Sequence, residues 1–426
     1  MNNIFSGEEY GVNKTYFAGR EDFLRKLRKI ITDGSLIIDW RIIGKMGYGK
    51  TSLAKVFKSI ITDEFSTKNI LYLNIDFRKI KKPDLLFSTS GNPTSLFYQS
   101  LLDKIYHELK SKNLKCQFYY NSKRIISQIK SIKIPFIGTT REIDLSPQIT
   151  SSYLNELNTI LRLNKTVIDS LIITFDDLNS LKDDVALKAC SNYCRSLKES
   201  ADIFIEKDFN IKNITTIVLA PFYRSERELK QRFNFDFEDI LPELDKLAIE
   251  NYLQKRLDIN CFENLQAIAN SIFFYTGGIP KAFQFLGLDA YGNYLRDAEK
   301  TKKKFSENYI KAAFSNGKAI GQIRRDIISG LKETIFIILE NSIDQTIIKN
   351  ISELTTLQNE NTGLRWLEKD EWATLIYKNI PEDIASKNIS FNKIWNYLLG
   401  QEVIKKEGYK YRFTSEMHRK AINKAV

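Results

Sequence analysis

Four short apolar runs alternate with stretches of helical periodicity in the first half of the chain. Short runs of this kind, bounded by polar residues, are typical of buried strands, and helical stretches between them favour parallel pairing. We therefore expect an α/β fold, with a parallel sheet and helices on both of its faces. The runs that predict strands are residues 36–43, 70–76, 171–175 and 215–220.

After residue 241 the pattern becomes helical. Apolar residues recur with helical spacing in three successive segments, which predicts a small helical lid. A run of charges at residues 300–304 then marks a junction. The lid helices are expected at residues 244–257, 265–274 and 281–295.

The last part of the chain alternates helices with a basic hairpin. Ser390 is placed to cap the last of these helices. A Glu-Gly turn then separates two short strands within residues 404–413. Helices followed by such a hairpin resemble a winged helix. The helices are expected at residues 331–339, 366–378 and 390–403.

A chain of 426 residues is too long for one ordinary core, so we expect several domains. The first of them also holds an insertion, because 125 positions separate Thr51 from Asp176. We place this insertion at about residues 87–147. The expected domains are a core at residues 1–241, a helical lid at 242–304 and a winged-helix-like domain at 305–426.

The segment between the first predicted strand and the next helix carries the full G-x-x-x-x-G-K-[ST] spacing of a phosphate-binding loop. Its glycines let backbone N–H groups face the phosphates, the Lys50 ammonium reaches the β- and γ-phosphates, and the Thr51 hydroxyl is a Mg²⁺ ligand. The helix that follows adds its N-terminus to the anion site. The residues expected to hold a nucleoside triphosphate here are Gly44, Gly47, Gly49, Lys50, Thr51 and Ser52.

The third predicted strand ends in Asp176 and Asp177. An apolar strand ending in such a pair is typical of the Walker B element of P-loop ATPases. In that role Asp176 holds Mg²⁺, directly or through water, and Asp177 orients or deprotonates the attacking water. Alternatively, the two aspartates cap the helix that follows. The phosphate-binding loop elsewhere in the chain favours the catalytic role.

The loop and the acidic pair together indicate an ATPase. No N-K-x-D stretch stands in a position suited to reading guanine, which disfavours a GTPase. A nucleotide kinase would need an acceptor pocket and lid arginines, and we identify neither in the sequence. ATP with Mg²⁺ is therefore the expected cofactor.

Composition indicates a folded cytoplasmic protein with no membrane partner. No window approaches the roughly 18 consecutive apolar residues that a membrane span requires. The N-terminus lacks the basic and apolar stretches of a secretory signal. The four cysteines suit a reducing compartment.

The net charge of +12 is concentrated in two windows, residues 101–135 and 391–426. Each window has eight basic residues, against two acidic residues in the first and three in the second. Clusters of this kind fit contacts with DNA phosphates. Lysines on solvated helix faces are the alternative explanation.

Four segments resemble, in the same order, motifs of the signal-transduction ATPases with numerous domains (STAND) and of the origin-recognition type of AAA+ ATPases. The resemblance implies a P-loop NTPase of the ASCE type with a lid and a C-terminal winged helix. It also implies that Arg20 meets the nucleotide, that Pro280 packs on the adenine and that Lys281 approaches the γ-phosphate. The four segments are residues 17–21, the phosphate-binding loop, residues 171–177 and residues 276–283.

The chain departs from the family pattern at two points. An Ala-Pro pair at residues 220–221 replaces the polar sensor expected at the end of the fourth strand. Arg224 is then a candidate for the arginine of that strand end or for a finger that reaches a neighbouring subunit, with Arg227 and Arg232 as further candidates; a surface arginine is the other interpretation. Lys281 stands where the origin-recognition relatives carry arginine, and a lysine lacks the bidentate fork.

The winged-helix resemblance supplies candidate DNA contacts. Residues of the last helix would meet bases or phosphates in a major groove, and residues of the hairpin would meet the backbone. Winged helices in such ATPases also pack on the core or bind proteins, so that role stays open. The candidates are Asn392, Lys393 and Asn396 on the helix and Lys405, Lys406, Lys410 and Arg412 on the hairpin.

We therefore expect an ATP-driven switch that hydrolyses ATP slowly, forms self-oligomers and acts on or near DNA. Proteins of the resembled families act in antiviral defence and in the replication or transposition of mobile elements. The nuclease, protease or toxin domain of many defence members is missing here, so an effector would be a separate protein. The alternative is a nucleotide-dependent scaffold whose winged helix binds protein rather than DNA.

Overall fold

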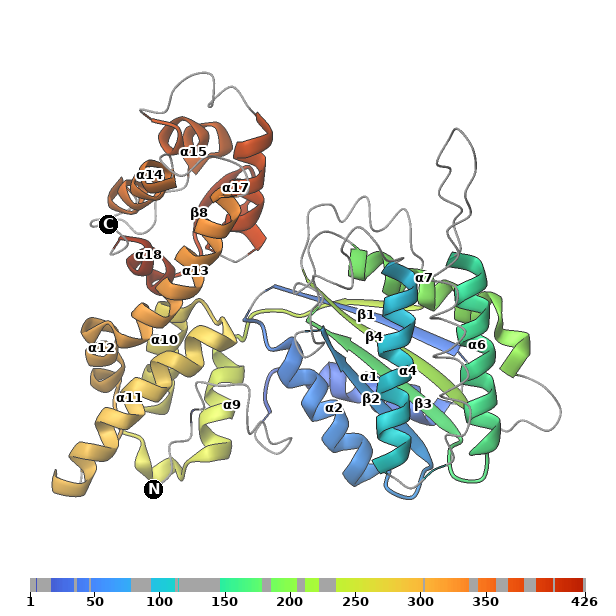
Figure 1. Cartoon of the computed structure of the whole chain (residues 1–426). Coiled ribbons are helices and arrows are strands. Elements are labelled where there is room, and N and C mark those ends of the chain that lie inside the picture. Colours follow the sequence, from blue (N-terminus) through green and yellow to red (C-terminus); the bar gives the residue numbers. More distant parts are fainter. Residues whose placement is uncertain are drawn as a thin grey trace.

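The computed structural model describes most of the chain (Figure 1). Among the described residues, none of the helices combines the length and the apolar character that crossing a bilayer requires. The described residues are Phe5, 17–33, 37–45, 47–77, 93–111, 114, 146–177, 185–204, 211–221, 235–301, 303–336, 344–357, 367–378, 388–400 and 403–423.

Five strands form the main sheet in the order β2-β3-β4-β1-β5, and all four pairings are parallel. Strand β1 is buried along almost its whole length, because it is flanked by β4 and β5 and covered on both faces. The predicted α/β fold with a parallel sheet is therefore confirmed. The strands are β1 (Ile37–Gly44), β2 (Ile70–Asp76), β3 (Ser170–Asp176), β4 (Asn213–Pro221) and β5 (Phe237–Ile240).

Strand β5 was not predicted from the sequence. Its four residues contain no apolar run, and three of them are exposed at the edge of the sheet. Two of its carboxylates pair inward. Glu238 accepts a hydrogen bond from the buried Arg41, and Asp239 accepts from Trp40 Nε1 at 2.6 Å and from Lys26 Nζ at 2.6 Å. These pairs hold a polar strand on the sheet edge.

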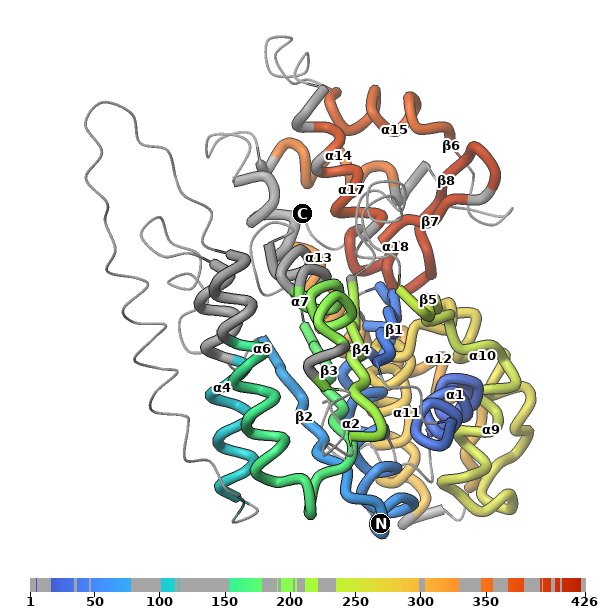
Figure 2. The backbone as a smooth tube through the Cα atoms, turned by 90° about the vertical axis from the view of Figure 1, so that its right-hand side faces the viewer, coloured from blue at the N-terminus to red at the C-terminus, as the bar shows by residue number. Residues whose placement is uncertain are grey.

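Helices cover both faces of this sheet (Figures 1 and 2). Helices α1 and α2 pack on the face that carries Trp40 and Ile42, and α4, α6 and α7 pack on the face that carries Ile173 and Val218. Within the predicted insertion, α4 lies against α6 and β2. The helices are α1 (Glu21–Asp33), α2 (Lys50–Glu64), α4 (Pro93–Ser111), α6 (Ser146–Leu163), α7 (Val185–Glu199) and the short η4 (Ala201–Phe204).

The three predicted lid helices are present as α9, α10 and α11. Side-chain caps fix two of their starts: Asp245 accepts from the N–H of Ala248 at 2.6 Å, and Asn264 accepts from the N–H of Ala267 at 3.0 Å. Helix α12 follows the predicted boundary at residue 304 and yet packs on α10 and α11. The elements are α9 (Lys246–Arg256), η5 (Ile259–Cys261), α10 (Leu265–Thr276), α11 (Pro280–Thr301) and α12 (Glu307–Asn316).

The C-terminal region contains the predicted hairpin, since β7 and β8 pair antiparallel and β6 adds a third strand on the side of β8. The first predicted helix, at residues 331–339, is helical over residues 331–336, but α13 begins much earlier, at Lys318; residues 337–339 lie outside the described residues. Helices α14 and α18 were not predicted. The elements are α13 (Lys318–Phe336), α14 (Asp344–Leu357), β6 (Leu367–Glu368), α15 (Lys369–Ile376), α17 (Asn388–Gly400), β7 (Ile404–Glu407), β8 (Lys410–Phe413) and α18 (Glu416–Asn423).

A buried histidine makes this region sensitive to pH. Burial lowers the pKa of His418 from 6.5 to about 4, and its Nδ1 lies 2.8 Å from Ser415 Oγ. Below pH 6.5, His418 binds a proton in the unfolded chain, whereas in the folded chain it stays neutral until the pH approaches 4. His418 is therefore expected to lower the free energy of unfolding by about 3 kcal/mol as the pH falls from 6.5 to 4.

Urea unfolding of the wild type and of His418→Gln at pH 7 and at pH 4.5 measures this contribution. The wild type should lose more stability than the variant over this interval. The other histidine of the chain, His107, is exposed, and His107→Gln is the control that should follow the wild type. Equal losses in the wild type and in His418→Gln would contradict the prediction.

Candidate functional site

The loop between β1 and α2 has the backbone that a phosphate-binding loop needs. Gly47 and Gly49 have φ values of 80° and 88°, in the left-handed region that favours glycine. Helix α2 begins directly after Gly49 without a side-chain cap and without an acidic residue in its first turn. Its first N–H groups, which include those of Thr51 and Ser52, therefore suit a bound anion.

Lys50 lies at the centre of this site. Its Nζ donates to the carbonyl oxygens of Gly44 at 2.5 Å and of Lys45 at 3.0 Å. Burial lowers the pKa of Lys50 to about 8, and the nearby carboxylates of Asp176 and Asp177 oppose this shift. Lys50 is half-buried as a residue, but its ammonium is desolvated beside the acidic end of β3, and it remains largely protonated at pH 7.

The acidic pair at the end of β3 has an unusual backbone. Asp176 is buried, and its Oδ1 accepts a hydrogen bond from the N–H of Asp177 at 2.9 Å. Asp177 has a φ of 54°, which is uncommon for any residue other than glycine. Helix α7 begins only at Val185, so the two aspartates do not cap it. Because neighbouring parallel strands end at the same edge, this pair and the loop after β1 share one edge of the sheet.

Arg20 is buried, and its guanidinium is bonded to the backbone. It donates to the carbonyl oxygens of Gly19 at 2.7 Å and of Pro242 at 2.5 Å. Burial lowers its pKa to about 10. These bonds tie the start of α1 to the segment that leads into the lid. The contact between Arg20 and nucleotide stays a prediction.

The predicted lid motif lies against the phosphate-binding loop. The N–H of Lys281, in the first turn of α11, donates to the carbonyl oxygen of Gly47 at 3.1 Å. Pro280 is the first residue of that helix. The ammonium of Lys281 does not lie on the loop but pairs with Asp326 of α13 at 2.7 Å.

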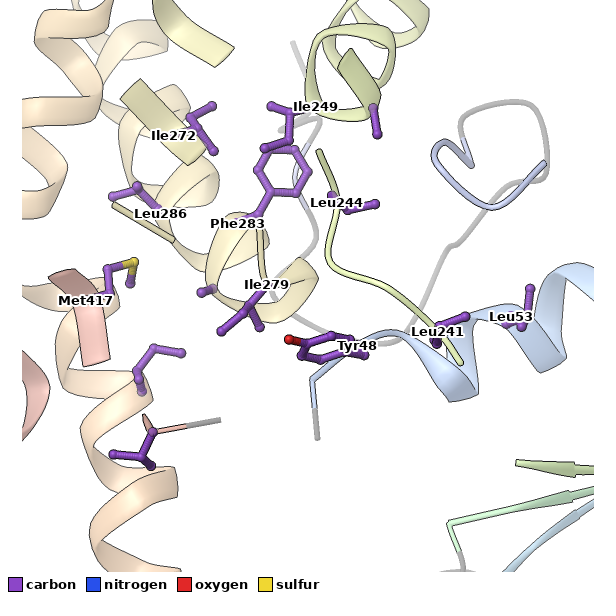
Figure 3. Close-up of a cluster of buried hydrophobic side chains, with 14 of the residues drawn as sticks. Tyr48, Leu53, Leu241, Leu244, Ile249, Ile272, Ile279, Phe283, Leu286 and Met417 are labelled. Carbon is purple, nitrogen blue, oxygen red and sulfur yellow. The ribbon is translucent and has the colours of Figure 1, made fainter. Parts of the chain in front are cut away.

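A tyrosine of the loop packs in the contact between the phosphate-binding loop and the lid motif. Tyr48 is buried, and Figure 3 places its ring beside Ile279 of the lid motif and near Leu241. Its hydroxyl donates to Glu243 Oε1 at 3.3 Å, and burial raises its pKa. The ring therefore joins the loop to the lid by apolar packing.

Lys45 of the same loop interacts electrostatically with the C-terminal hairpin. Burial lowers the pKa of Lys45, the carboxylate of Glu243 raises it, and the charge of Lys405 on β7 lowers it further. Lys405 is thus within electrostatic reach of Lys45 in the phosphate-binding loop. Figure 2 shows β7 beside the end of the sheet where β5 and β1 lie.

The structure places the other hairpin residues on a short antiparallel ribbon. Lys406 is exposed, Lys410 and Arg412 are half-buried, and the intervening Tyr409 is 70% exposed at the turn. On α17, Asn392 is exposed and accepts from Lys369 Nζ at 3.1 Å, whereas Asn396 is half-buried. The role of these residues in contacting DNA stays a prediction.

Some of the candidates lie outside the described residues. Arg224, Arg227 and Arg232 fall between residues 221 and 235, which the structure does not describe. Lys393 belongs to α17, but its side chain is not described. The roles assigned to these four residues stay predictions.

Sequence reasoning missed several residues of this site. Glu243 belongs to no motif, and Tyr48 occupies a variable position of the phosphate-binding loop. An aromatic residue inside a glycine-rich loop is nevertheless a local signal for a packed contact. Asp326 had no local signal, because it lies far from Lys281 in the sequence and only the packing of α13 on α11 brings the two together.

The sheet order, the loop between β1 and α2 and the acidic end of β3 define a P-loop NTPase fold. Neither a protein-family model nor a curated protein matches the sequence. The chain is similar to many solved structures, including the following two. One is the ORC2 protein of Aeropyrum pernix, with a TM-score of 0.53, 13% identity and 96% of each chain covered. The other is a Walker-type ATPase of Pyrococcus abyssi, with a TM-score of 0.50, 14% identity and 95% of each chain covered.

These likenesses concern the fold, because the identities are low. They agree with the origin-recognition type of AAA+ ATPase that the motifs resemble. Neither of the two is described as a STAND protein, so that part of the resemblance remains a prediction.

Proposed function

We propose that this chain is an ATP-driven switch that binds ATP with Mg²⁺ at the loop between β1 and α2 and hydrolyses the ATP slowly. The observation that carries this proposal is the uncapped start of α2 beside a buried Lys50 ammonium and the Asp176–Asp177 pair. A buried cation and an uncapped helix N-terminus suit a polyphosphate, and a neighbouring carboxylate pair suits its metal ion.

Each residue of the loop and of the acidic pair has a role in this proposal. Lys50 holds the β- and γ-phosphates, while Thr51 and Asp176 hold Mg²⁺, which neutralises charge on the transferred phosphoryl group. Asp177 takes a proton from the attacking water, and ADP and phosphate are the products. We also infer that Arg224 of a neighbouring subunit completes the charge stabilisation, so that self-assembly controls turnover.

Asp177→Asn separates binding from turnover. Asparagine adopts the left-handed backbone readily, so the φ of 54° is retained. We expect ATP affinity to stay within about twofold, whereas the hydrolysis rate should fall by about 100-fold or more because the proton acceptor is lost. Steady-state phosphate release and ATP titration measure the two effects.

Asp169→Asn is the matched control, because Asp169 directly precedes the opposite end of the same strand and pairs with Lys212 at 3.0 Å. It should leave turnover unchanged. Normal turnover in Asp177→Asn would reject the role of Asp177.

We further infer that the C-terminal region is a winged helix that binds DNA. Support comes from the basic hairpin, which carries Lys406 on β7, the exposed Tyr409 at the turn and Lys410 on β8. Lysines contact DNA phosphates, and the exposed tyrosine ring suits contact with sugar or base. The alternative is a scaffold in which this region binds protein.

The salt dependence of DNA binding distinguishes these two functions. Each phosphate contact contributes about −0.9 to the slope of log affinity against log salt, so Lys406→Ala/Lys410→Ala should flatten the slope by roughly two. The exposed pair Lys303 and Lys304 supplies a control of equal charge, Lys303→Ala/Lys304→Ala, which should keep the wild-type slope. An unchanged slope in the hairpin variant would exclude the hairpin as a DNA contact.

A further inference from the structure

The lysine of the lid motif is held by a carboxylate of another element. Lys281 is anchored at the phosphate-binding loop by its backbone, since its N–H donates to Gly47 at 3.1 Å. A Cβ built on Gly47 would lie only 3.1 Å from Lys281 Cβ. Even so, the Lys281 ammonium pairs at 2.7 Å with Asp326 of α13. Lys281 Cδ would also lie 3.6 Å from that Cβ, so the side chain runs along the loop and its ammonium is held there by Asp326.

Asp326 lies on the helix that connects the lid to the C-terminal region. Helix α13 packs on α11 at one side and on α17 and α18 at the other, and Figure 1 shows it running between the two parts. Directly after Asp326, the carbonyl oxygen of Ile327 accepts a hydrogen bond from Tyr397 of α17 at 3.0 Å. A change at Asp326 is therefore one residue away from the helix that carries Asn392 and Asn396.

The loop beside Lys281 carries further charges. Lys45, Lys50 and Lys405 bring three further cations to the same region. Glu243 lies beside Lys45, while Asp176 and Asp177 lie beside Lys50. The carboxylate of Asp326 supplies the anion that pairs with Lys281. The two side chains are each about one-third exposed, at 34% and 29%, and the Asp326 Oδ2 that meets the ammonium is itself buried.

We propose that Asp326 is a positioning residue that competes with the terminal phosphate of ATP for Lys281, and so couples the C-terminal region to the nucleotide. This inference rests on the proposed function, because it requires a nucleotide at the loop. When ATP binds, its terminal phosphate replaces Asp326 as the anion paired with Lys281, and α13 loses this contact. ADP lacks the terminal phosphate, so the pair between Lys281 and Asp326 stays intact. The energy that separates the two states is the differential affinity of Lys281 for its two anions.

The test is a set of titrations with ATP–Mg²⁺ and with ADP–Mg²⁺ on the full chain. Asp326→Asn removes the competitor and keeps the shape of the side chain. It should tighten ATP binding by about twofold to fivefold, the range expected for a partly exposed ion pair, with ADP binding unchanged. In the Lys281→Ala background, Asp326→Asn should have no effect on either nucleotide.

Asp289→Asn is the matched control. Asp289 and Lys318 form a second ion pair between α11 and α13, at 3.7 Å, which does not involve the lysine at the loop. This variant loosens the same two helices, so an unchanged ratio of ATP to ADP affinity shows that the effect of Asp326→Asn is not general loosening. Equal tightening in Asp289→Asn would overturn the inference.

A second measurement does not depend on affinity. Amide hydrogen exchange in α13 should rise when ATP–Mg²⁺ is added to the wild type, stay unchanged with ADP–Mg²⁺, and already be raised in Asp326→Asn without nucleotide. If the wild type binds ATP but Asp326→Asn leaves both the affinity ratio and the exchange unchanged, this inference fails and the proposed function stands. If the wild type binds neither nucleotide, the proposed function fails and takes this inference with it.

Discussion

Replacement of Gly278 by alanine is expected to lower the free energy of unfolding by about 3 kcal/mol or more. Gly278 has a φ of 74°, and a Cβ at this position would lie 2.1 Å from the carbonyl oxygen of Leu244. The same approach allows the N–H of Leu244 to donate to the Gly278 carbonyl oxygen at 2.8 Å. The variant therefore strains the backbone and separates Leu244, in the segment that leads into the lid, from Gly278, between α10 and α11.

Gly408→Ala is the control for the strain alone. Gly408 has a φ of 63° at the hairpin turn, but nothing lies within 4 Å of a Cβ built there. Its cost should be only about 1 kcal/mol. Urea unfolding of both variants measures the difference. Equal costs would show that the close contact between Gly278 and Leu244 does not contribute to stability.

Lys50→Ala is expected to abolish ATP binding at the loop. The variant removes an ammonium that donates to the loop carbonyls and lies near the carboxylates of Asp176 and Asp177. Charge-assisted bonds to phosphate in a desolvated site are strong, so affinity should fall by roughly 100-fold or more. Displacement of a fluorescent ATP analogue measures this loss.

Lys58→Ala is the matched control, since Lys58 is an exposed lysine on the same helix α2. It removes an equal charge from the same element and should leave ATP affinity within about twofold of the wild type. Retained ATP binding in Lys50→Ala, with a fold that matches the control, would mean that the nucleotide binds elsewhere.

The parts of the site that follow from local chemistry could be predicted from the sequence. The loop at residues 44–51 needs glycines and a lysine at fixed spacing, so its motif is visible in a dozen residues. The end of β3 is visible for the same reason, because an apolar run followed by Asp176 and Asp177 marks a strand edge. Parallel strand order then brings the two motifs together.

The elements that were missed depend on distant partners. Strand β5 has no apolar run, and it stays on the sheet through Arg41, Trp40 and Lys26, which the sequence does not link to it. The start of α13 was a different error, because buried Ile320, Ile323 and Ile327 carry helical spacing that predicts the helix before residue 331.

The pairing of Lys281 could not be predicted from its motif. The motif places the backbone of Lys281 at the loop, and the structure agrees in the bond to Gly47. Which anion holds its ammonium depends on the packing of α13 against α11, and the partner is Asp326. A motif thus predicts where a side chain starts, but the tertiary contacts decide where its charge lies.

Isothermal titration calorimetry of the folded wild type with ATP–Mg²⁺ tests the central claim most directly. The account predicts a saturable heat of association at one site per chain, which disappears in Lys50→Ala. The absence of any heat at millimolar ATP–Mg²⁺, in protein that circular dichroism shows to be well folded, would contradict it.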